Sequence, residues 1–360
     1  MVMARSRKIL KYWFLIAVLV VIFIAEIVPH LTADGGLPWP DTSAKYGTVP
    51  IVFLLSGLTL PTDNLLTAAK QYDLHFVTQC FSLLFTPLFV KLLTVVLAPT
   101  GVDDWIMKGF IISSSMPVSS SSVVATICAD GNEAAAIVNC IVGALLGMIT
   151  TPLILLILVC FLRWAFVPSF CITVVCVILI LLLQIRSAAV VSPVKSLHDL
   201  ILTVGTPLLV GQIVRKVTGM RLQHSIALKI RQLALLMTVF ITFCDIFMSH
   251  LDVELQPINV LVSVFSVVIL QMTLLLLIFW TTRYLPSKFS LQDTKAIMFC
   301  STHKSLSLGI PILRTMYSGY GHLYSASLPL LLYYPSQIIL GELLGQHMKN
   351  WVDWDSGHDK

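Results

Sequence analysis

The chain has 360 residues, of which 57% are hydrophobic and only 11% are charged, and its mean hydropathy is +0.91. This composition excludes a soluble globular domain and is typical of a helical protein embedded in a lipid bilayer. The formal net charge of +5 comes from basic residues at the ends of hydrophobic runs, so it does not indicate nucleic-acid binding. Because apolar segments recur along the chain, a targeting peptide does not explain them.

Ten hydrophobic runs have roughly the 17–25 residues that one bilayer crossing needs. They are Tyr12–Val28, Tyr46–Leu60, Leu74–Leu97, Trp105–Thr126, Ala134–Val159, Leu200–Val214, Arg231–Phe247, Ile258–Trp280, Ala296–Met316 and Leu323–Gly345. With five spans per half, the second half starts on the opposite side of the membrane, as an inverted repeat requires. We therefore predict an all-α, polytopic membrane protein with one five-helix repeat in residues 1–160, a second in 196–348, and a C-terminal tail in 349–360.

The charged residues predict the orientation of these spans. Basic residues cluster in the N-terminal tail and in residues 215–231 and 283–295, which the ten-span order places on one side. Acidic residues occupy loops of the other side: Asp34, Asp41, Asp103, Asp104, Asp252 and Glu254. Because Lys and Arg collect in cytoplasmic loops, we expect both termini in the cytoplasm.

Residues 161–195 do not fit this order, because they contain a further hydrophobic run, Phe170–Gln184. A single crossing there would invert everything downstream and move the most basic loop outside, so we expect that this run does not cross alone. Two explanations stay open: a lineage-specific insertion, or a gene-model error such as retained noncoding sequence. RNA sequencing across the segment decides between them.

The fourth span is interrupted by seven serines around Pro117. Proline removes a helix hydrogen bond, and nearby hydroxyls can bond to the freed backbone groups. A kinked helix of small packing residues is one explanation. Seven hydroxyls exceed what packing requires, so we predict that Pro117 breaks the helix and that serines line a polar cavity. The candidate substrate- or ion-binding residues here are Ser119, Ser120, Ser121 and Ser122.

The ninth span places a lysine near its midpoint. If the segment stays helical, Ser301, Lys304 and Ser305 share a face beside Thr302, and Gly309 and Pro311 break the helix further on. A lysine at that depth cannot easily extend to the interface. It can replace a bound sodium ion, pair with an acid or attract an anionic substrate. A structural salt bridge, or capping of the carbonyls left by the break, is the alternative.

Other polar residues within spans have simpler explanations. Asn139, Gln79 and Gln337 are isolated amides, for which hydrogen bonding between helices is the default. The eight cysteines contain no C-x-x-C pair and are expected to pack as small apolar residues. The chain carries neither H-E-x-x-H nor G-x-S-x-G, and no P-loop. We therefore expect no enzyme, no catalytic residue, no resident metal and no cofactor.

Several of these segments resemble the bile acid/sodium symporter family, most closely its sodium/bile acid cotransporter 7 subgroup. The similarity is carried by Gly131–Ala136, Thr206–Arg215, Thr242–Asp245 and, above all, Phe299–Pro311. It covers nearly the whole chain outside roughly residues 161–190. The resemblance implies ten helices in two inverted repeats, with discontinuous helices four and nine crossing at the substrate and ion sites. It also implies a core domain that moves against a panel domain.

The chain departs from that family where sodium is bound. Transporting members carry Pro-Gly-Gly-x-x-Ser-Asn in span four, where this chain has Pro117–Val123. They carry Glu-Thr-Gly-x-Gln-Asn in span nine, so the acidic sodium ligand falls at Ser301 and a lysine stands nearby. The span-five hydroxyl ligands fall at Ala136 and near Asn139 and Cys140. Replacing a carboxylate by a hydroxyl and adding an ammonium is adverse to sodium.

Two functions are therefore expected. The first is an orphan secondary transporter of a small ion or organic anion, which the resemblance associates with restraint of cytosolic calcium. The second is a non-transporting regulatory protein that limits calcium entry by contact with channels or pumps. For both, the resemblance implies the plasma membrane, the endoplasmic reticulum or the Golgi apparatus, with calcium-entry machinery as a partner.

Overall fold

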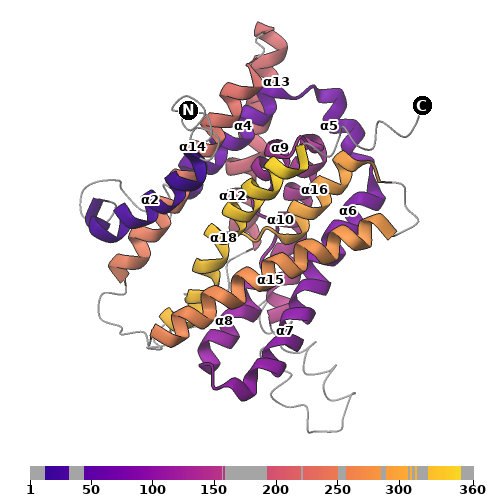
Figure 1. Cartoon of the computed structure of the whole chain (residues 1–360). Helices are drawn as coiled ribbons and strands as arrows, with labels where there is room; N and C mark the ends of the chain where they lie inside the picture. The colour runs from indigo at the N-terminus through magenta and orange to yellow at the C-terminus, as the bar shows by residue number, and fades with distance from the viewer. Residues whose placement is uncertain are drawn as a thin grey trace, which may run out of the picture.

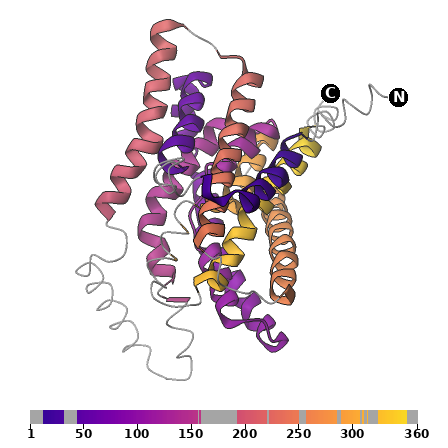
Figure 2. The same ribbon diagram turned by 90° about the vertical axis from the view of Figure 1, so that its left-hand side faces the viewer.

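The computed structural model describes residues 13–31, 44–155, 157–158, 193–219, 222–249, 257–284, 289–306, 309, 313 and 323–349. Within these ranges the chain is a bundle of helices without strands, and its one β feature is an isolated bridge (Figures 1 and 2). Residues 161–192 of the atypical segment lie outside the described ranges, so the two explanations of that segment are untested.

The α-helices have these bounds: α2 (Trp13–Ile27), α4 (Val49–Thr59), α5 (Thr62–Ala69), α6 (Tyr72–Gln79), α7 (Thr86–Leu97), α8 (Asp104–Ser114), α9 (Ser121–Cys128), α10 (Glu133–Leu155), α12 (Pro193–Leu200), α13 (Thr206–Thr218), α14 (His224–Ser249), α15 (Pro257–Tyr284), α16 (Leu291–Thr302) and α18 (Leu323–Lys349). Short 3₁₀ turns are η1 (Pro29–Leu31) and η4 (Ala98–Thr100). Three π-helical segments are η2 (Ala44–Thr48), η3 (Cys80–Phe85) and η6 (Ile201–Gly205).

The prediction of an all-α polytopic membrane protein is confirmed. Five continuous stretches are long and apolar enough to cross a bilayer: Tyr72–Leu97, Glu133–Leu155, Leu197–Thr218, His224–Cys244 and Val260–Tyr284. A sixth candidate is the pair Tyr46–Thr59 and Thr62–Ala69, which is bent by 107°. Large apolar side chains such as Phe23, Leu88, Leu209 and Ile269 are exposed, as lipid-facing residues are. The count of ten crossings and the inverted repeat stay predictions.

The helices pack in two groups. One, called the four-helix group here, consists of α2, α4, α13 and α14: α13 packs on α4, α4 on α14, and α14 on α2. The other, called the crossing group, consists of α6 to α10 with α15, α16 and α18. Figure 1 shows α2, α4 and α14 at one side of the bundle and α6 at the other, with α15 running across the front. Inside the four-helix group, Gly57 and Gly211 let α4 and α13 touch: a Cβ atom on either glycine would lie 2.4 Å from a carbonyl oxygen of the other helix.

Each π-helical segment ends just before a proline, at Pro50, Pro87 and Pro207. Proline has no N–H to donate, so the preceding turn loses a hydrogen bond and can widen to the i to i+5 pattern. In η3 the N–H of Thr86 donates to the carbonyl of Phe81, five residues earlier. In the same pattern the carbonyl of Ser82 would face the nitrogen of Pro87, so it needs a partner from elsewhere.

Candidate functional site

The breaks in the fourth and ninth spans meet in the centre of the crossing group. α8 ends at Ser114 and α9 begins at Ser121, while α16 ends at Thr302. Val118 and Lys304 form an antiparallel bridge between the two unwound segments. The N–H of Ser119 donates to His303 (3.1 Å), and the N–H of Ser305 donates to Pro117 (2.9 Å). The two breaks therefore supply backbone partners to each other, as buried polar backbone at membrane depth requires. We call this place the crossing.

The expectation that Ser301, Lys304 and Ser305 share one helix face is wrong. His303 is extended, with φ of −81° and ψ of 120°, and ends α16 before Lys304. The helix ends there because the next residues pair with the other break instead of continuing the turn. Gly309 lies beyond this end, and Pro311 lies outside the described ranges.

Gln337 of α18 holds the second break. Its side-chain oxygen accepts from the N–H of Lys304 (2.7 Å), and its amide nitrogen donates to the carbonyl of Lys304 (3.0 Å). The same nitrogen donates to the hydroxyl of Ser121 (3.2 Å). The hydroxyl of Tyr333 donates to the carbonyl of Thr302 at the end of α16 (2.9 Å). Two side chains of α18 thus satisfy the backbone of the second break.

The ammonium of Lys304 points to η3. Its Nζ donates to the carbonyl oxygen of Ser82 (2.6 Å) and to the hydroxyl of Ser82 (2.9 Å). That carbonyl is the one that Pro87 leaves without an amide partner. Lys304 is only 1% exposed, and among the described residues its ammonium contacts no carboxylate. Within the described part of the chain, a lysine side chain without a carboxylate partner is thus buried at the crossing.

The serines of the first break bond both to backbone and to other side chains. Ser122 donates to the carbonyl of Ser119 (2.7 Å), and the Oγ atoms of Ser121 and Ser119 lie 3.1 Å apart. Ser121 also contacts Nδ1 of His303 (3.1 Å). Ser120 is partly exposed at the start of α9. Of the predicted residues, Ser119, Ser121 and Ser122 lie at the crossing with Thr302, Lys304 and Ser305.

Asn139 lies one layer away on α10. Its side-chain oxygen is 3.1 Å from Nδ1 of His75 and 3.3 Å from the amide nitrogen of Gln79. Two buried atoms near these helices, Oγ of Ser301 and Oε1 of Gln79, have no hydrogen-bond partner within the described ranges. Asn139 therefore joins α6 to α10, whereas Ser301 retains an unused hydroxyl.

Thiols surround the serine that corresponds to a sodium ligand in the resemblance. The hydroxyl of Ser122 lies 3.4 Å from the sulfur of Cys140 and 3.5 Å from that of Cys300. Sodium, like other hard cations, is bound by oxygen ligands, and thiols are soft ones. These residues do not fit a sodium ion.

A polar cavity lies at one end of the bundle, which we call the α5 end. Its volume is about 460 Å³, and its wall includes Thr59 and Glu133. Polar side chains complete the wall: Asn64, Thr67, Gln71, Asn132, His224 and Gln292. Glu133 accepts a hydrogen bond from Arg231 of α14 (2.7 Å). The cavity therefore lies between helices of the two groups, and a buried ion pair borders it.

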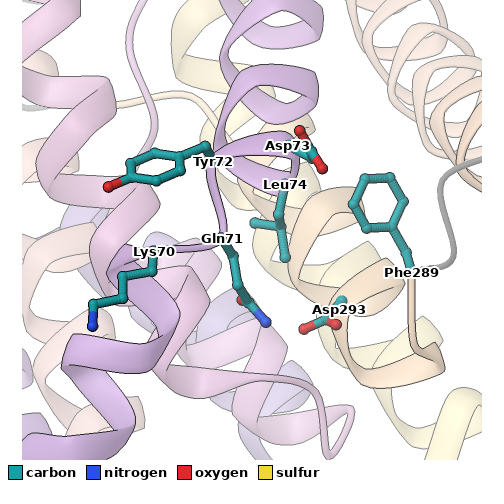
Figure 3. Close-up of a pocket in the computed structure, with 7 residues that line it drawn as sticks. All are labelled: Lys70, Gln71, Tyr72, Asp73, Leu74, Phe289 and Asp293. Carbon is teal, nitrogen blue, oxygen red and sulfur yellow. The ribbon is translucent and has the colours of Figure 1, made fainter.

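A second cavity of about 240 Å³ lies at the same end, between the start of α6 and the start of α16. Figure 3 shows the carboxylates of Asp73 and Asp293 on different sides of this cavity, with Leu74 and Phe289 in its wall. Both oxygens of Asp293 are already bonded, one to Asn132 (2.7 Å) and one to Ser290 (2.7 Å). Asp293 therefore holds helix ends together, and the described residues contain no group of three metal-ligating side chains.

Sequence reasoning missed four residues that shape these sites. Gln337 was recognised as an isolated amide, but its contact with Lys304 was not. Ser82 gave no signal of its own, although Pro87 after it could have indicated a carbonyl in need of a partner. Glu133 was noted only within the segment Gly131–Ala136, and Arg231 only at the end of a basic loop. Only the tertiary structure brings them together.

Residues 12–350 match the SBF-like CPA transporter family. The chain is 36% identical to sodium/bile acid cotransporter 7 of Danio rerio over 361 residues, which cover 99% of this chain and 98% of the relative. It is 34% identical to sodium/bile acid cotransporter 7 of Rattus norvegicus over 353 residues, 97% of this chain and 96% of the relative. The chain is also 24% identical to solute carrier RCH1 of Candida albicans over 380 residues, which cover 94% of this chain and 89% of the relative.

Proposed function

This chain belongs to the SBF-like CPA transporter family, and on that premise we propose that it is a secondary carrier that works by alternating access without sodium at the crossing. Its substrate is a small ion or an organic anion. The observation that carries the proposal is the buried ammonium of Lys304, which is bonded to Ser82 at the meeting point of the two breaks. A resident cation there takes the role that a bound sodium ion would otherwise have.

Electrostatics supports this exclusion of sodium. A second positive charge ~5 Å from the ammonium would be opposed by ~3 kcal/mol at an effective dielectric constant of about 20. Ser301 offers a neutral hydroxyl where a sodium site needs a carboxylate, and the thiols of Cys140 and Cys300 flank Ser122. The positive charge of Lys304 and the lack of suitable oxygen ligands therefore both disfavour sodium binding.

The cellular role that we propose is restraint of cytosolic calcium, from membranes of the secretory pathway and the plasma membrane, with both termini in the cytoplasm. The support is the resemblance to the cotransporter 7 subgroup together with the basic segments of the sequence. With this orientation the α5 end of the bundle faces the cytoplasm, because α5 lies in the loop that follows the second span.

Binding of radioactive sodium to the purified protein tests the exclusion of sodium. We expect no saturable binding to the wild type. The double variant Ser301→Glu with Lys304→Ala restores a carboxylate and removes the ammonium, so it should gain saturable binding. Lys108→Ala, which removes a lysine stacked on Trp105 (3.6 Å), is the matched control and should leave binding absent. Saturable sodium binding to the wild type would contradict the proposal.

Calcium imaging in cells that lack the protein tests the cellular role. Wild type should lower calcium entry equally well in sodium medium and after sodium is replaced by N-methylglucamine. Lys304→Met, which keeps the chain length and removes the charge, should lose most of this effect, while Lys108→Met should keep it.

The regulatory alternative is favoured by one observation: the polar groups of the crossing are largely bonded within the protein. A protein that acts only by contact with calcium-entry machinery would restrain calcium entry without its crossing residues. Full rescue by Lys304→Met, with normal amounts of protein at the membrane, would therefore replace the carrier proposal by this one.

A further inference from the structure

A buried ion pair connects the two groups of helices. Nη2 of Arg231, on α14 of the four-helix group, donates to Oε1 of Glu133, on α10 of the crossing group (2.7 Å). The same nitrogen donates to the hydroxyl of Thr59 on α4 (2.8 Å). Arg231 is fully buried and Glu133 is 8% exposed. The guanidinium thus ties α4 and α14 to the first turn of α10.

The ion pair lies between a polar cavity and an apolar cluster of side chains. On the α5 side lies the polar cavity of about 460 Å³, with Thr59 and Glu133 in its wall. Further along the same helices, apolar side chains of both groups pack into one cluster that includes Val52 of α4, Val124 of α9 and Val239 of α14. The pair therefore lies at the boundary between the polar cavity and this apolar cluster.

On energetic grounds, the ion pair is better suited to a contact that opens and closes than to one that stabilises the fold. Burying two charges carries a desolvation penalty that their attraction often fails to offset. Two further donors of Arg231, Nε and Nη1, have no hydrogen-bond partner within the described ranges. Water that enters between α10 and α14 would hydrate all of these groups, so the separated state is favoured by solvation and the closed state by packing. A contact of this kind can switch between two states.

We propose that the Arg231–Glu133 pair is the cytoplasmic gate of this protein. When it is closed, it blocks the path from the α5-end cavity to the crossing. When the four-helix group moves away from the crossing group, the pair breaks and the path opens. The proposal rests on the alternating-access function and on the cytoplasmic position of the α5 end.

Two native cysteines at the crossing report on the gate. Cys140 and Cys300 are buried beside Ser122, about two helical turns beyond the cavity residues Glu133 of α10 and Gln292 of α16. The experiment follows their modification by a membrane-impermeant maleimide in inside-out vesicles that contain the full-length protein, with mass spectrometry to identify the labelled residues. Slow labelling is expected for the wild type.

Glu133→Gln and Arg231→Met remove one charge each and should raise the labelling rate about tenfold, which corresponds to about 1.4 kcal/mol in the opening equilibrium. The charge swap Glu133→Arg with Arg231→Glu re-forms a pair and should return the rate close to that of the wild type. The control is Lys349→Met, which breaks the exposed pair with Asp130 (3.3 Å) at the same end and should change nothing.

Unchanged labelling in both single variants would overturn the gate. So would a rise that appears equally in right-side-out vesicles, because that pattern means general unfolding. If the single variants do not fold, the folded charge swap decides: a wild-type rate supports the gate and fast labelling refutes it. Labelling needs no substrate, so it can succeed even where the calcium restraint proves independent of Lys304. In that case the pair still controls access to the crossing, and only the proposed carriage of a substrate across the membrane fails.

Discussion

In both breaks the unwound backbone finds hydrogen-bond partners, but the two breaks obtain these partners from different places. The first, from Ser115 to Ser120, relies mainly on hydroxyls of its own neighbourhood, such as Ser113 and Ser114, which bond to carbonyls three residues earlier. The second, which begins at His303, relies on Gln337 and on other side chains from distant segments. A break rich in serine thus carries its own partners, whereas a break with few hydroxyls must obtain them from other helices.

This difference also indicates which parts move together. The distant partners of the second break, Gln337, Tyr333 and Ser82, all belong to the crossing group. The first break is tied to the same group, since Thr151 of α10 donates to the carbonyl of Ser115 (2.9 Å). Both breaks are therefore held within one group of helices. Motion between the groups would leave the crossing intact and act on contacts such as Arg231 with Glu133.

The largest loss of stability should come from replacing Gln337, whose side chain bonds to the N–H and the carbonyl of Lys304 in the second break. Gln337→Leu leaves the N–H and the carbonyl of Lys304 without their partners, and each buried group left in this state costs ~1–3 kcal/mol. We expect the free energy of unfolding, measured in mixed detergent and dodecyl sulfate micelles, to fall by ~3 kcal/mol or more.

The matched control for Gln337→Leu is Ser336→Ala on the same helix. The hydroxyl of Ser336 donates to the carbonyl of Leu332 (2.7 Å), within its own helix, so its loss should be nearly neutral. If Gln337→Leu is no more destabilising than Ser336→Ala, the second break does not depend on α18 and the comparison between the breaks fails.

A smaller effect should show whether Lys304 caps the carbonyl that Pro87 exposes. Lys304→Met removes the donor to Ser82 but also removes a buried charge, so the single variant alone is ambiguous. In a Pro87→Ala background, residue 87 regains an N–H that can donate to Ser82. The cost of Lys304→Met should then be lower by ~1–2 kcal/mol than in the wild type.

Pro207→Ala provides the control for this double-mutant cycle. Pro207 follows the π-helical segment η6 in the four-helix group, so it ends the same kind of turn without contact to Lys304. The cost of Lys304→Met should be the same with and without Pro207→Ala. Equal coupling in both backgrounds would mean that proline acts on helix stability in general and not on Ser82.

The sequence predicted what depends on local composition. The sequence pointed to the two interrupted spans through Pro117 with its serines and through the lysine at mid-span, because unwound backbone within a membrane needs polar residues nearby. It placed the end of α16 too late, since Gly309 and Pro311 are strong local breakers while His303 is not. Pairing with the other break ends the helix there, and such pairing is not encoded within one segment.

The site was less predictable than the fold for the same reason. Glu133 and Arg231 are 98 positions apart, and each has an adequate local explanation in a helix start or a basic loop. Gln337 and Lys304 are 33 positions apart, with a break between them. Contacts of this kind depend on how helices are arranged in space, and a pattern of hydrophobicity gives little information about that arrangement.

The smallest effect should be found inside the first break. Ser114→Ala removes a hydroxyl that donates to the carbonyl of Ile111 (2.7 Å), but that carbonyl also accepts from the N–H of Ser115 (3.2 Å). We expect a loss of ~0.5 kcal/mol, near the average for hydrogen bonds in membrane helices. Thr151→Val should cost more, ~1–2 kcal/mol, because the amide of Ser119 bonds to His303 and leaves the carbonyl of Ser115 to Thr151. The same unfolding measurement checks both variants. If Ser114→Ala costs as much as Thr151→Val, hydroxyls within the segment matter as much as those from another helix. The first break would then be no more self-sufficient than the second.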